Sequence, residues 1–217
     1  MDDDKNKFPV AVDPATISPV RSIIGQHPRP RGYANKPRPA MVNGITIHQT
    51  GCNMPANING WARLNAHMGI TTEGMIYWVN NPIDFIWHAQ GLSPLTIGIE
   101  VEGNWYGIEG NPKTLWKGGG APAKMNDKID VAIREALDMC YRWIMAQAPV
   151  NKWERLTNAK PTFKGVYAHR QSSDTRLWDP GQAIYKIAHQ FNVLKKTTDC
   201  EYEKFGDGSP ITLEWVL

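Results

Sequence analysis

The chain has 217 residues and 41% of them are hydrophobic, which favours one globular domain with extensions over two full domains. Its 24 basic and 21 acidic residues give a net charge of +3, too small to predict a nucleic-acid partner, and no apolar run approaches the roughly 20 residues of a membrane span. The first residues lack the basic start and apolar stretch of a secretory signal. We therefore expect synthesis in the cytoplasm, with any action outside the cell depending on another system for release or export.

Proline and basic residues dominate the first 40 residues, which hold seven of the sixteen prolines. Because proline removes a hydrogen-bond donor and fixes the backbone, we expect residues 1–40 to form an extended arm on the surface of the domain. Contact between this basic arm and an acidic polymer is the alternative. The folded domain itself is expected at residues 41–193.

The first clear strand is predicted at residues 44–50, GITIHQT, where apolar and β-branched residues end at a polar turn. His48 lies at the end of this strand. Asn59 can cap a helix that runs through His67, and a tight turn then leads into a strand at residues 75–79. We expect His67 to support the fold.

Two further strands are predicted at residues 83–88 and 97–102. In the second, IGIEVE, three apolar residues alternate with Glu100 and Glu102, as in a strand with one buried face. We expect Glu100 to point into a cleft and carry protons. The alternative is a solvated face, which suits Glu102.

A segment rich in glycine and aromatic residues follows at residues 103–127 and is too long for a simple connection. Asn104, Trp105 and Tyr106 leave the preceding strand directly, so we expect them to line a cleft where aromatic faces stack on sugar rings. A loop that folds onto the surface without contacting a ligand is the alternative.

The C-terminal half predicts two amphipathic helices. Apolar residues recur at spacings of three and four over residues 126–148 and again over residues 180–192, so each helix has one stripe facing the core. Between them, a short strand ends at His169, and the proline that follows Asp179 suits the first turn of the second helix. Residues 194–217 are expected to pack back on the domain as a tail.

Three candidate metal ligands lie at the ends of these elements. His48 and His169 each follow a predicted strand, and Asp179 precedes a predicted helix. Two histidines and one carboxylate are a recurrent ligand set for catalytic zinc, which keeps a fourth position open for water. Each residue also has an ordinary alternative, as a structural histidine or a helix cap, and Cys52 is an alternative ligand.

Five segments occur in an order that resembles the type 2 N-acetylmuramoyl-L-alanine amidases, which are similar to phage amidase lysozymes and the peptidoglycan recognition proteins. They are GITIHQTG, HMGITTEGMIYWV, WHAQG, IGIEVEGNW and AHRQSSDTRLWDPG. The resemblance implies an α/β fold with a mixed central β-sheet flanked by helices and one zinc ion per chain. It also implies hydrolysis of the amide between N-acetylmuramic acid and L-alanine in peptidoglycan.

The resemblance also implies roles for individual residues. The metal ligands that it implies are His48, His169 and Asp179. It implies that Glu100 is the catalytic carboxylate and that His88, with its neighbour Trp87 in the WHAQG motif, contacts substrate.

The chain departs from the family at one position. Bacterial members usually have a lysine two residues before the last ligand, and this chain has Leu177 there. Arg176 is adjacent and is our candidate for the cation that stabilises an oxyanion, although arginine and lysine differ in geometry.

The main hypothesis is a cell-wall lytic enzyme similar to phage endolysins. We expect a monomer that acts on peptidoglycan or muropeptides, without a nucleic-acid or membrane partner. Two alternatives use the same site: a recognition module that binds peptidoglycan without cleaving it, and a recycling amidase that acts on small soluble muropeptides.

Overall fold

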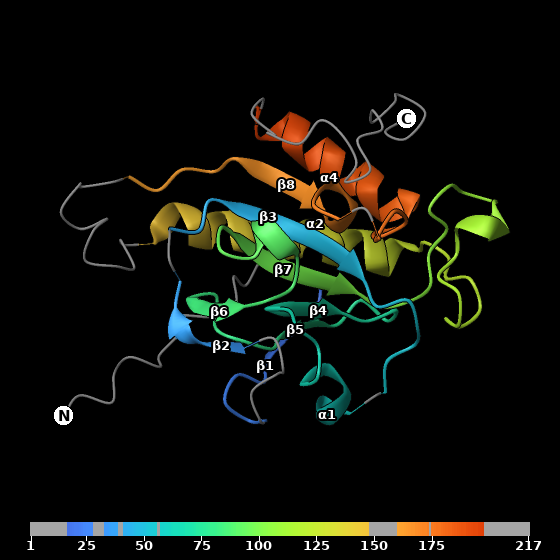
Figure 1. Cartoon of the computed structure of the whole chain (residues 1–217), viewed down its shortest axis with the longest axis horizontal. Helices are drawn as coiled ribbons and strands as arrows, with labels where there is room; N and C mark the ends of the chain where they lie inside the picture. The colour runs from blue at the N-terminus through green and yellow to red at the C-terminus, as the bar shows by residue number, and fades with distance from the viewer. Residues whose placement is uncertain are drawn as a thin grey trace.

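A computed structural model describes residues 17–27, 33–38, 41–55, 57–147, 160–173 and 175–197. Its centre is a six-stranded mixed sheet with the strand order β1-β5-β4-β7-β3-β8 (Figure 1). These strands are β1 (Val20–Ser22), β3 (Gly44–Gln49), β4 (Met68–Ile70), β5 (Ile76–Trp78), β7 (Thr96–Val101) and β8 (Gly165–Ala168). The α/β fold with a mixed central sheet flanked by helices is therefore confirmed. No helix in the described ranges is long and apolar enough to cross a membrane.

Two helices, α2 (Asp127–Ala146) and α4 (Gln182–Leu194), pack on the same side of the central strands (Figure 1). Side chains alternate between the two faces of a strand. Ile45 and Ile47 of β3 therefore join the apolar residues of both helices in the main hydrophobic core. Thr46 and His48 point to the opposite face, which carries the polar side chains of the sheet.

The predicted boundaries of α2 and α4 are largely correct. The side chain of Asn126 accepts a hydrogen bond from the Ile129 amide at 3.0 Å and so caps the start of α2. The second helix starts later than predicted, because Gly181 is its N-cap and Pro180 precedes it. The amide of Gln182, the first helical residue, donates to the carbonyl of Tyr106 at 2.8 Å, which ties the helix start to the long loop.

One predicted helix and one missed strand lie between β3 and β5. Only α1 (Ile58–Trp61) is helical, capped by Asn57, so the predicted extension to His67 is wrong. The chain instead forms β4, which pairs with β5 and β7. The ring of Trp61 packs against the backbone of Gly69, where a Cβ atom would lie 2.2 Å from the ring. This three-residue strand depends on partners from elsewhere in the chain, so its own sequence does not reveal it.

The expectation that the N-terminal segment is a surface arm is wrong for its described part. Strand β1 pairs in parallel with β5 at the edge of the central sheet, and β2 (Tyr33–Pro37) pairs with β6 (Asp84–Ile86) in a second, two-stranded sheet. Ile23 and Arg38 are completely buried. The folded unit therefore begins before residue 41. Residues 1–16 lie outside the described ranges. The part of the predicted C-terminal tail after residue 197 lies outside them too.

Glu102 is also more buried than expected. Its carboxylate accepts hydrogen bonds from the amides of Met54 at 2.7 Å and Thr72 at 2.9 Å. It therefore joins two loops at the end of β7 and does not face solvent.

Arg38 connects the N-terminal segment to the polar face of the sheet. Its guanidinium donates to the carbonyl oxygens of Pro82 at 2.7 Å, Ser93 at 2.9 Å and Thr96 at 3.0 Å. Its Nη2 also lies 2.8 Å from Nε2 of His67. Burial lowers the pKa of Arg38 to about 9, an effect that the nearby charge of Asp84 partly opposes.

We predict that Arg38→Ala destabilises the protein by about 3–5 kcal/mol, because it leaves several buried carbonyl groups without donors. Urea unfolding followed by circular dichroism measures this change. Arg63→Ala, at an exposed position, is the control and should change stability by less than about 0.5 kcal/mol. Equal stability of the two variants would contradict the anchoring role of Arg38.

Candidate metal centre and active site

The parallel pairing of β7, β3 and β8 places three candidate residues side by side. His48 of β3 pairs with Glu100 of β7, and Ile47 pairs with Ala168 of β8, so His169 follows at the level of His48. Side chains at paired positions of neighbouring strands point to the same face of a sheet. Strand register therefore brings His48, Glu100 and His169 together on the polar face.

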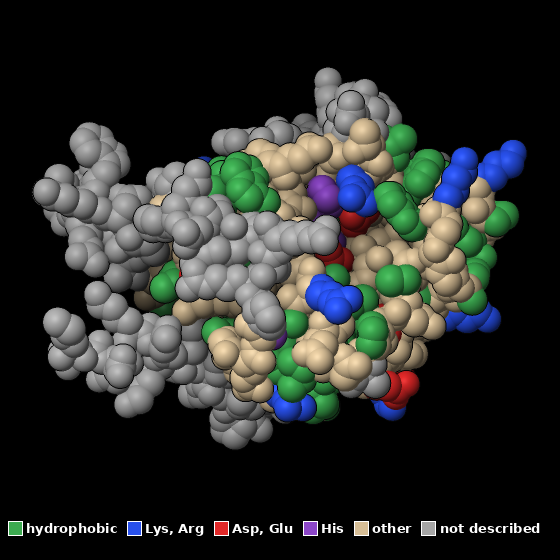
Figure 2. Space-filling view, turned by 60° about the horizontal axis from the view of Figure 1, so that its bottom comes forward, with side chains coloured by type: hydrophobic (Ala, Val, Ile, Leu, Met, Phe, Trp, Pro, Cys, Tyr) green, Lys and Arg blue, Asp and Glu red, His purple; other side chains and the backbone are tan. Residues whose placement is uncertain are grey.

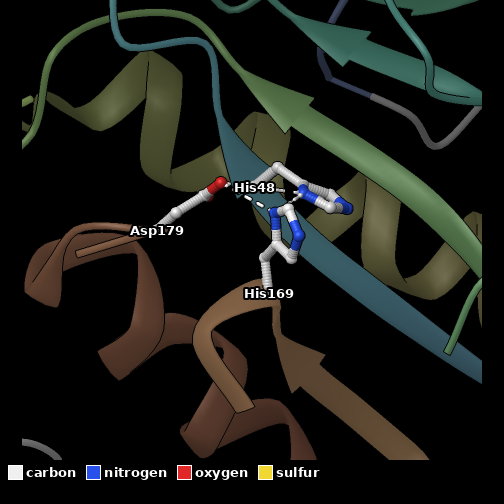
Figure 3. Close-up of side chains that lie close together, drawn as sticks. All are labelled: His48, His169 and Asp179. Carbon is white, nitrogen blue, oxygen red and sulfur yellow. Dashed lines mark hydrogen bonds and ion pairs between the residues drawn. The ribbon is translucent and has the colours of Figure 1, made fainter. Parts of the chain in front are cut away.

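Asp179 completes a compact group from a different direction. Figure 3 shows the side chains of His48, His169 and Asp179 pointing toward one another from β3, from the turn after β8 and from the segment before α4. Nδ1 of His169 lies 3.0 Å from Nδ1 of His48 and 2.9 Å from Oδ2 of Asp179. All three residues are buried, and one possible ligand atom from each lies within 4.8 Å of the others.

Backbone hydrogen bonds fix the position of Asp179. The amide of Gln49 donates to its Oδ1 atom at 2.9 Å, and the amide of Arg170 donates to its carbonyl oxygen at 2.8 Å. The side chain of Gln49 also accepts from the amide of Trp105 at 3.0 Å. Gln49 is a supporting residue that our sequence analysis missed, and its position next to His48 was the only available signal.

Charge and burial favour a cation in this group. Burial and the neighbouring His169 lower the pKa of His48 to about 4, so its imidazole is neutral at neutral pH. Burial opposes ionisation of Asp179, but the hydrogen bond from His169 and the closeness of the His48 ring outweigh it and hold the pKa of this carboxyl well below its usual range. Two imidazoles and one ionised carboxylate are therefore available as ligands, a set that fits zinc. Cys52 is exposed and lies outside this group.

Glu100 is a partly buried residue beside the candidate metal site. Its Oε2 atom is inaccessible to solvent and has no hydrogen-bond partner within the described part of the chain. Burial and the negative charge of Asp179 raise the pKa of Glu100 well above its usual value, while Arg176 opposes this rise. A carboxylate in such surroundings can accept and return a proton near neutral pH.

Aromatic and basic residues surround the site. The guanidinium carbon of Arg176 lies 4.7 Å from the ring centroid of Trp116, and its charge is close enough to affect both His48 and Glu100. Trp87 is half exposed and packs on the ring of Phe85. In the space-filling view, histidine and acidic side chains lie in a hollow bordered by basic and hydrophobic side chains (Figure 2).

Three of the residues expected to contact substrate have structural positions instead. Trp105 is buried in the main core, and Asn104 is buried and holds the long loop through hydrogen bonds with Trp116 and Gly120. His88 is buried against His48. Tyr106 is only partly buried, and its carbonyl group accepts from α4. We predicted a cleft position because these loop residues directly follow the strand that carries Glu100. The sequence shows where this loop starts, but it does not show how the loop folds back onto the domain.

A family model described as N-acetylmuramoyl-L-alanine amidase matches residues 36–182, more than half of the chain. The chain belongs to this family. The match includes all three candidate metal ligands, and it begins before the boundary that we predicted at residue 41. None of the curated proteins matches the sequence.

Two solved structures share the amidase fold at low sequence identity. The endolysin N-acetylmuramoyl-L-alanine amidase LysCS from Clostridium intestinale URNW is 17% identical, with a TM-score of 0.50, and the match covers 80% of this chain and 95% of that chain. Drosophila peptidoglycan recognition protein SD is 18% identical, with a TM-score of 0.51, and the match covers 80% of this chain and 94% of that chain. These similarities support the fold that we describe, and the chemistry of the candidate site must be argued from its own residues.

We predict that the metal-free protein loses stability as the pH falls below about 6.5. Burial lowers the pKa values of His48, His67 and His88, so the unfolded chain takes up protons that the folded chain excludes. As the pH falls, each of these histidines lowers the free energy of unfolding by up to about 1.4 kcal/mol per pH unit. Glu100 has a raised pKa and takes up a proton in the folded state, which offsets the effect of one histidine. Between pH 6.5 and 5.5 the net loss should be about 2 kcal/mol.

Urea unfolding in the presence of a chelator, at pH values from 7.5 to 5.5, measures this loss. Stability that stays constant over this range would show that the buried histidines accept protons in the folded state.

Proposed function

We propose that the chain is a zinc-dependent hydrolase that cleaves the amide bond between N-acetylmuramic acid and L-alanine in peptidoglycan. The observation that carries the proposal is the convergence of His48, His169 and Asp179 next to Glu100, whose Oε2 atom is inaccessible to solvent. Membership of the amidase family supports the substrate class. Lytic action on the cell wall, after release or export by another system, is part of the same proposal.

The ligands of the proposed zinc site are Nδ1 of His48, Nδ1 of His169 and the carboxylate of Asp179. A zinc ion held by three protein ligands lowers the pKa of a bound water to about 7 and polarises a carbonyl oxygen. The chain contributes rigidity, because Gln49 and Arg170 hold Asp179 through backbone amides, and the two histidines lie at the ends of adjacent strands. The three residues that would hold the ion are therefore fixed by the fold itself.

Glu100 is the proposed general base and acid. As an ionised carboxylate it takes a proton from the water that attacks the scissile carbonyl, and it then gives this proton to the leaving nitrogen of L-alanine. Its burial suits both steps, because a raised pKa makes the protonated form accessible at neutral pH. The negative charge that develops on the carbonyl oxygen needs a positive partner.

Arg176 is the proposed partner for this charge in place of the usual lysine. Its stacking on Trp116 holds the guanidinium next to the site, and its charge acts on Glu100. Leu177, at the position of the family lysine, is only partly buried, and its carbonyl oxygen accepts from Arg170. The exposed faces of Trp87 and Trp116 are the proposed contacts for sugar rings.

We predict that Glu100→Gln lowers turnover of peptidoglycan by about 10²- to 10⁴-fold, because it removes the group that accepts and returns the proton. Zinc content should stay the same, since Glu100 is outside the ligand set. Release of muropeptides measured by mass spectrometry, together with elemental analysis for zinc, checks both expectations.

Glu102→Gln is the matched control for this variant. Glu102 directly follows the strand that carries Glu100, but its carboxylate accepts hydrogen bonds from the amides of Met54 and Thr72 and from the Thr72 hydroxyl. The control should lower stability and leave turnover per folded molecule unchanged. Equal losses of turnover in both variants would remove Glu100 from the proposed mechanism.

We predict that a chelator abolishes hydrolysis and lowers the stability of the fold, and that stoichiometric zinc restores both. At a free zinc concentration 100 times the dissociation constant, binding adds about 2.7 kcal/mol to the free energy of unfolding. Thermal unfolding with and without chelator measures the stability change, and digestion of sacculi measures activity.

The same digestion separates the alternatives. A zinc-loaded chain that binds sacculi without releasing L-alanine N-termini would be a recognition module. A chain that cleaves soluble muropeptides but leaves sacculi intact would be a recycling amidase. Cleavage of intact sacculi at the expected amide supports the lytic enzyme.

A further inference from the structure

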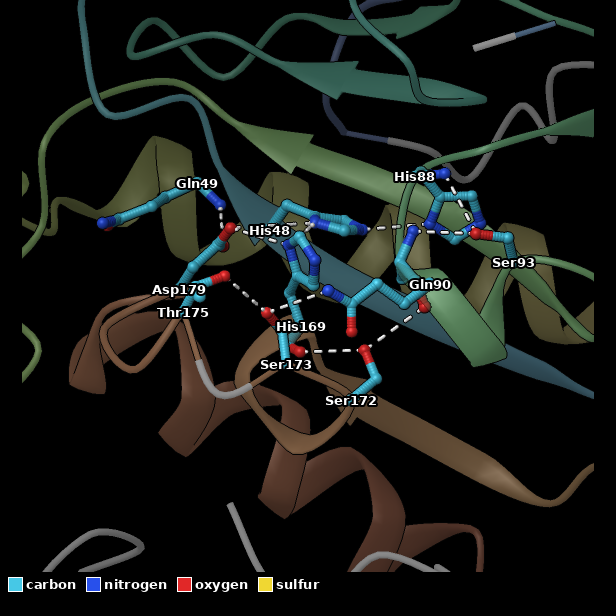
Figure 4. A network of polar contacts seen from close by, with 11 residues as sticks. His48, Gln49, His88, Gln90, Ser93, His169, Ser172, Ser173, Thr175 and Asp179 are labelled. Atoms are coloured by element: carbon cyan, nitrogen blue, oxygen red, sulfur yellow. Dashed lines mark hydrogen bonds and ion pairs between the residues drawn. The ribbon is translucent and has the colours of Figure 1, made fainter. Parts of the chain in front are cut away.

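His88 lies directly behind the candidate metal ligand His48, on the side away from the other two ligands (Figure 4). Its Nδ1 atom lies 3.1 Å from Nε2 of His48, and its Nε2 atom lies 3.2 Å from the carbonyl oxygen of Thr96. The side chain is buried. Both ring nitrogens therefore face protein atoms, and the ring is poorly placed to contact a substrate.

The surrounding backbone holds this ring in one place. The hydroxyl oxygen of Ser93 accepts hydrogen bonds from the amides of His88 at 3.0 Å and Ala89 at 2.8 Å. On the sheet beneath, Gly98 leaves room for the ring, because a Cβ atom there would lie 2.8 Å from Cγ and Nδ1 of His88. The orientation of His88 is therefore fixed by its neighbours and does not depend on a bound metal.

The chain of contacts determines where the protons lie. The carbonyl oxygen of Thr96 can only accept a hydrogen bond, so Nε2 of His88 carries the proton that it receives. In a neutral ring, Nδ1 of His88 is then an acceptor, and it receives the proton of His48 Nε2. Nδ1 of His48 consequently has a free lone pair, and it is this atom that faces His169 and Asp179.

We propose that His88 is a positioning residue that keeps the proton of His48 on Nε2, so that Nδ1 is always ready to bind the metal. The proposal rests on the metal site of the proposed function. Outer hydrogen-bond partners commonly fix the tautomer and direction of a histidine ligand in this way.

The alternative tautomer of His48 explains why this control is useful. A proton on Nδ1 of His48 would form a hydrogen bond with Nδ1 of His169, which lies only 3.0 Å away, and would block the ligand atoms of both rings. With His88 in place, that tautomer directs two lone pairs at each other across the 3.1 Å between His48 and His88. The contact with His88 therefore selects the tautomer that can bind metal.

Two substitutions test the proposal. His88→Leu removes the acceptor and keeps an apolar side chain in the buried slot. His88→Asn is the matched control, because its Oδ1 atom can accept a hydrogen bond close to the position of Nδ1. Circular dichroism and thermal unfolding establish that each variant is folded.

Two measurements read out the effect. Competition with a chromophoric chelator gives the dissociation constant for Zn²⁺ alone. Long-range proton–nitrogen NMR of histidine-labelled, metal-free protein reports which nitrogen of His48 carries the proton. We expect Nε2–H in the wild-type chain, a 10- to 100-fold weaker zinc affinity in His88→Leu, and an affinity close to wild type in His88→Asn.

Three results would overturn the proposal: a proton on Nδ1 of His48 in the wild-type chain, unchanged zinc affinity in a folded His88→Leu variant, or equal weakening in both variants, which indicates a role in packing alone. If the leucine variant does not fold, the wild-type spectrum and the asparagine variant still decide. A wild-type chain that shows the expected tautomer but binds no zinc would refute the proposed function and leave the hydrogen-bond assignment intact.

Discussion

The register between β7, β3 and β8 is the constraint on which the candidate site depends. A shift of one residue in a strand moves every side chain to the other face of the sheet. The observed pairing places Glu100, His48 and His169 on one face and leaves Ile47 and its apolar neighbours on the other. Formation of the hydrophobic core under α2 and α4 therefore also assembles most of the site, because both faces belong to the same strands.

The third ligand reaches the site by another route. Asp179 lies between β8 and α4, and its position depends on amides of Gln49 and Arg170 and on the long loop, whose Trp105 packs in the core beneath. Residues that we first expected in a substrate cleft thus hold the ligands in place. The loop contributes to the site mainly by fixing α4 and by carrying Trp116 to the rim, where it stacks with Arg176.

Electrostatics in the buried site separate two kinds of carboxylate. Asp179 receives hydrogen bonds and keeps its charge, whereas Glu100 has a raised pKa and one oxygen with no hydrogen-bond partner among the described residues. Environments that shift the pKa values of two neighbouring acids in opposite directions are typical of sites in which one acid binds a cation and the other transfers protons. The buried polar layer continues from His48 through His88 to Thr96 and Arg38, so the metal ligands rest on a connected hydrogen-bond network.

The sequence by itself determined the elements whose pattern is local: the helix after Asn126, the strands around His48 and Glu100, and the histidines and aspartate at their ends. Those residues were predictable because apolar periodicity marks a buried helix or strand, and polar or turn-forming residues mark where it ends. Only the tertiary structure decided that β1 and β2 join the fold, and that His88 and Trp105 lie behind the site and not in a cleft. These residues are buried by contacts with segments that are distant in the sequence. Such contacts leave no periodic pattern of apolar residues in the segments that make them.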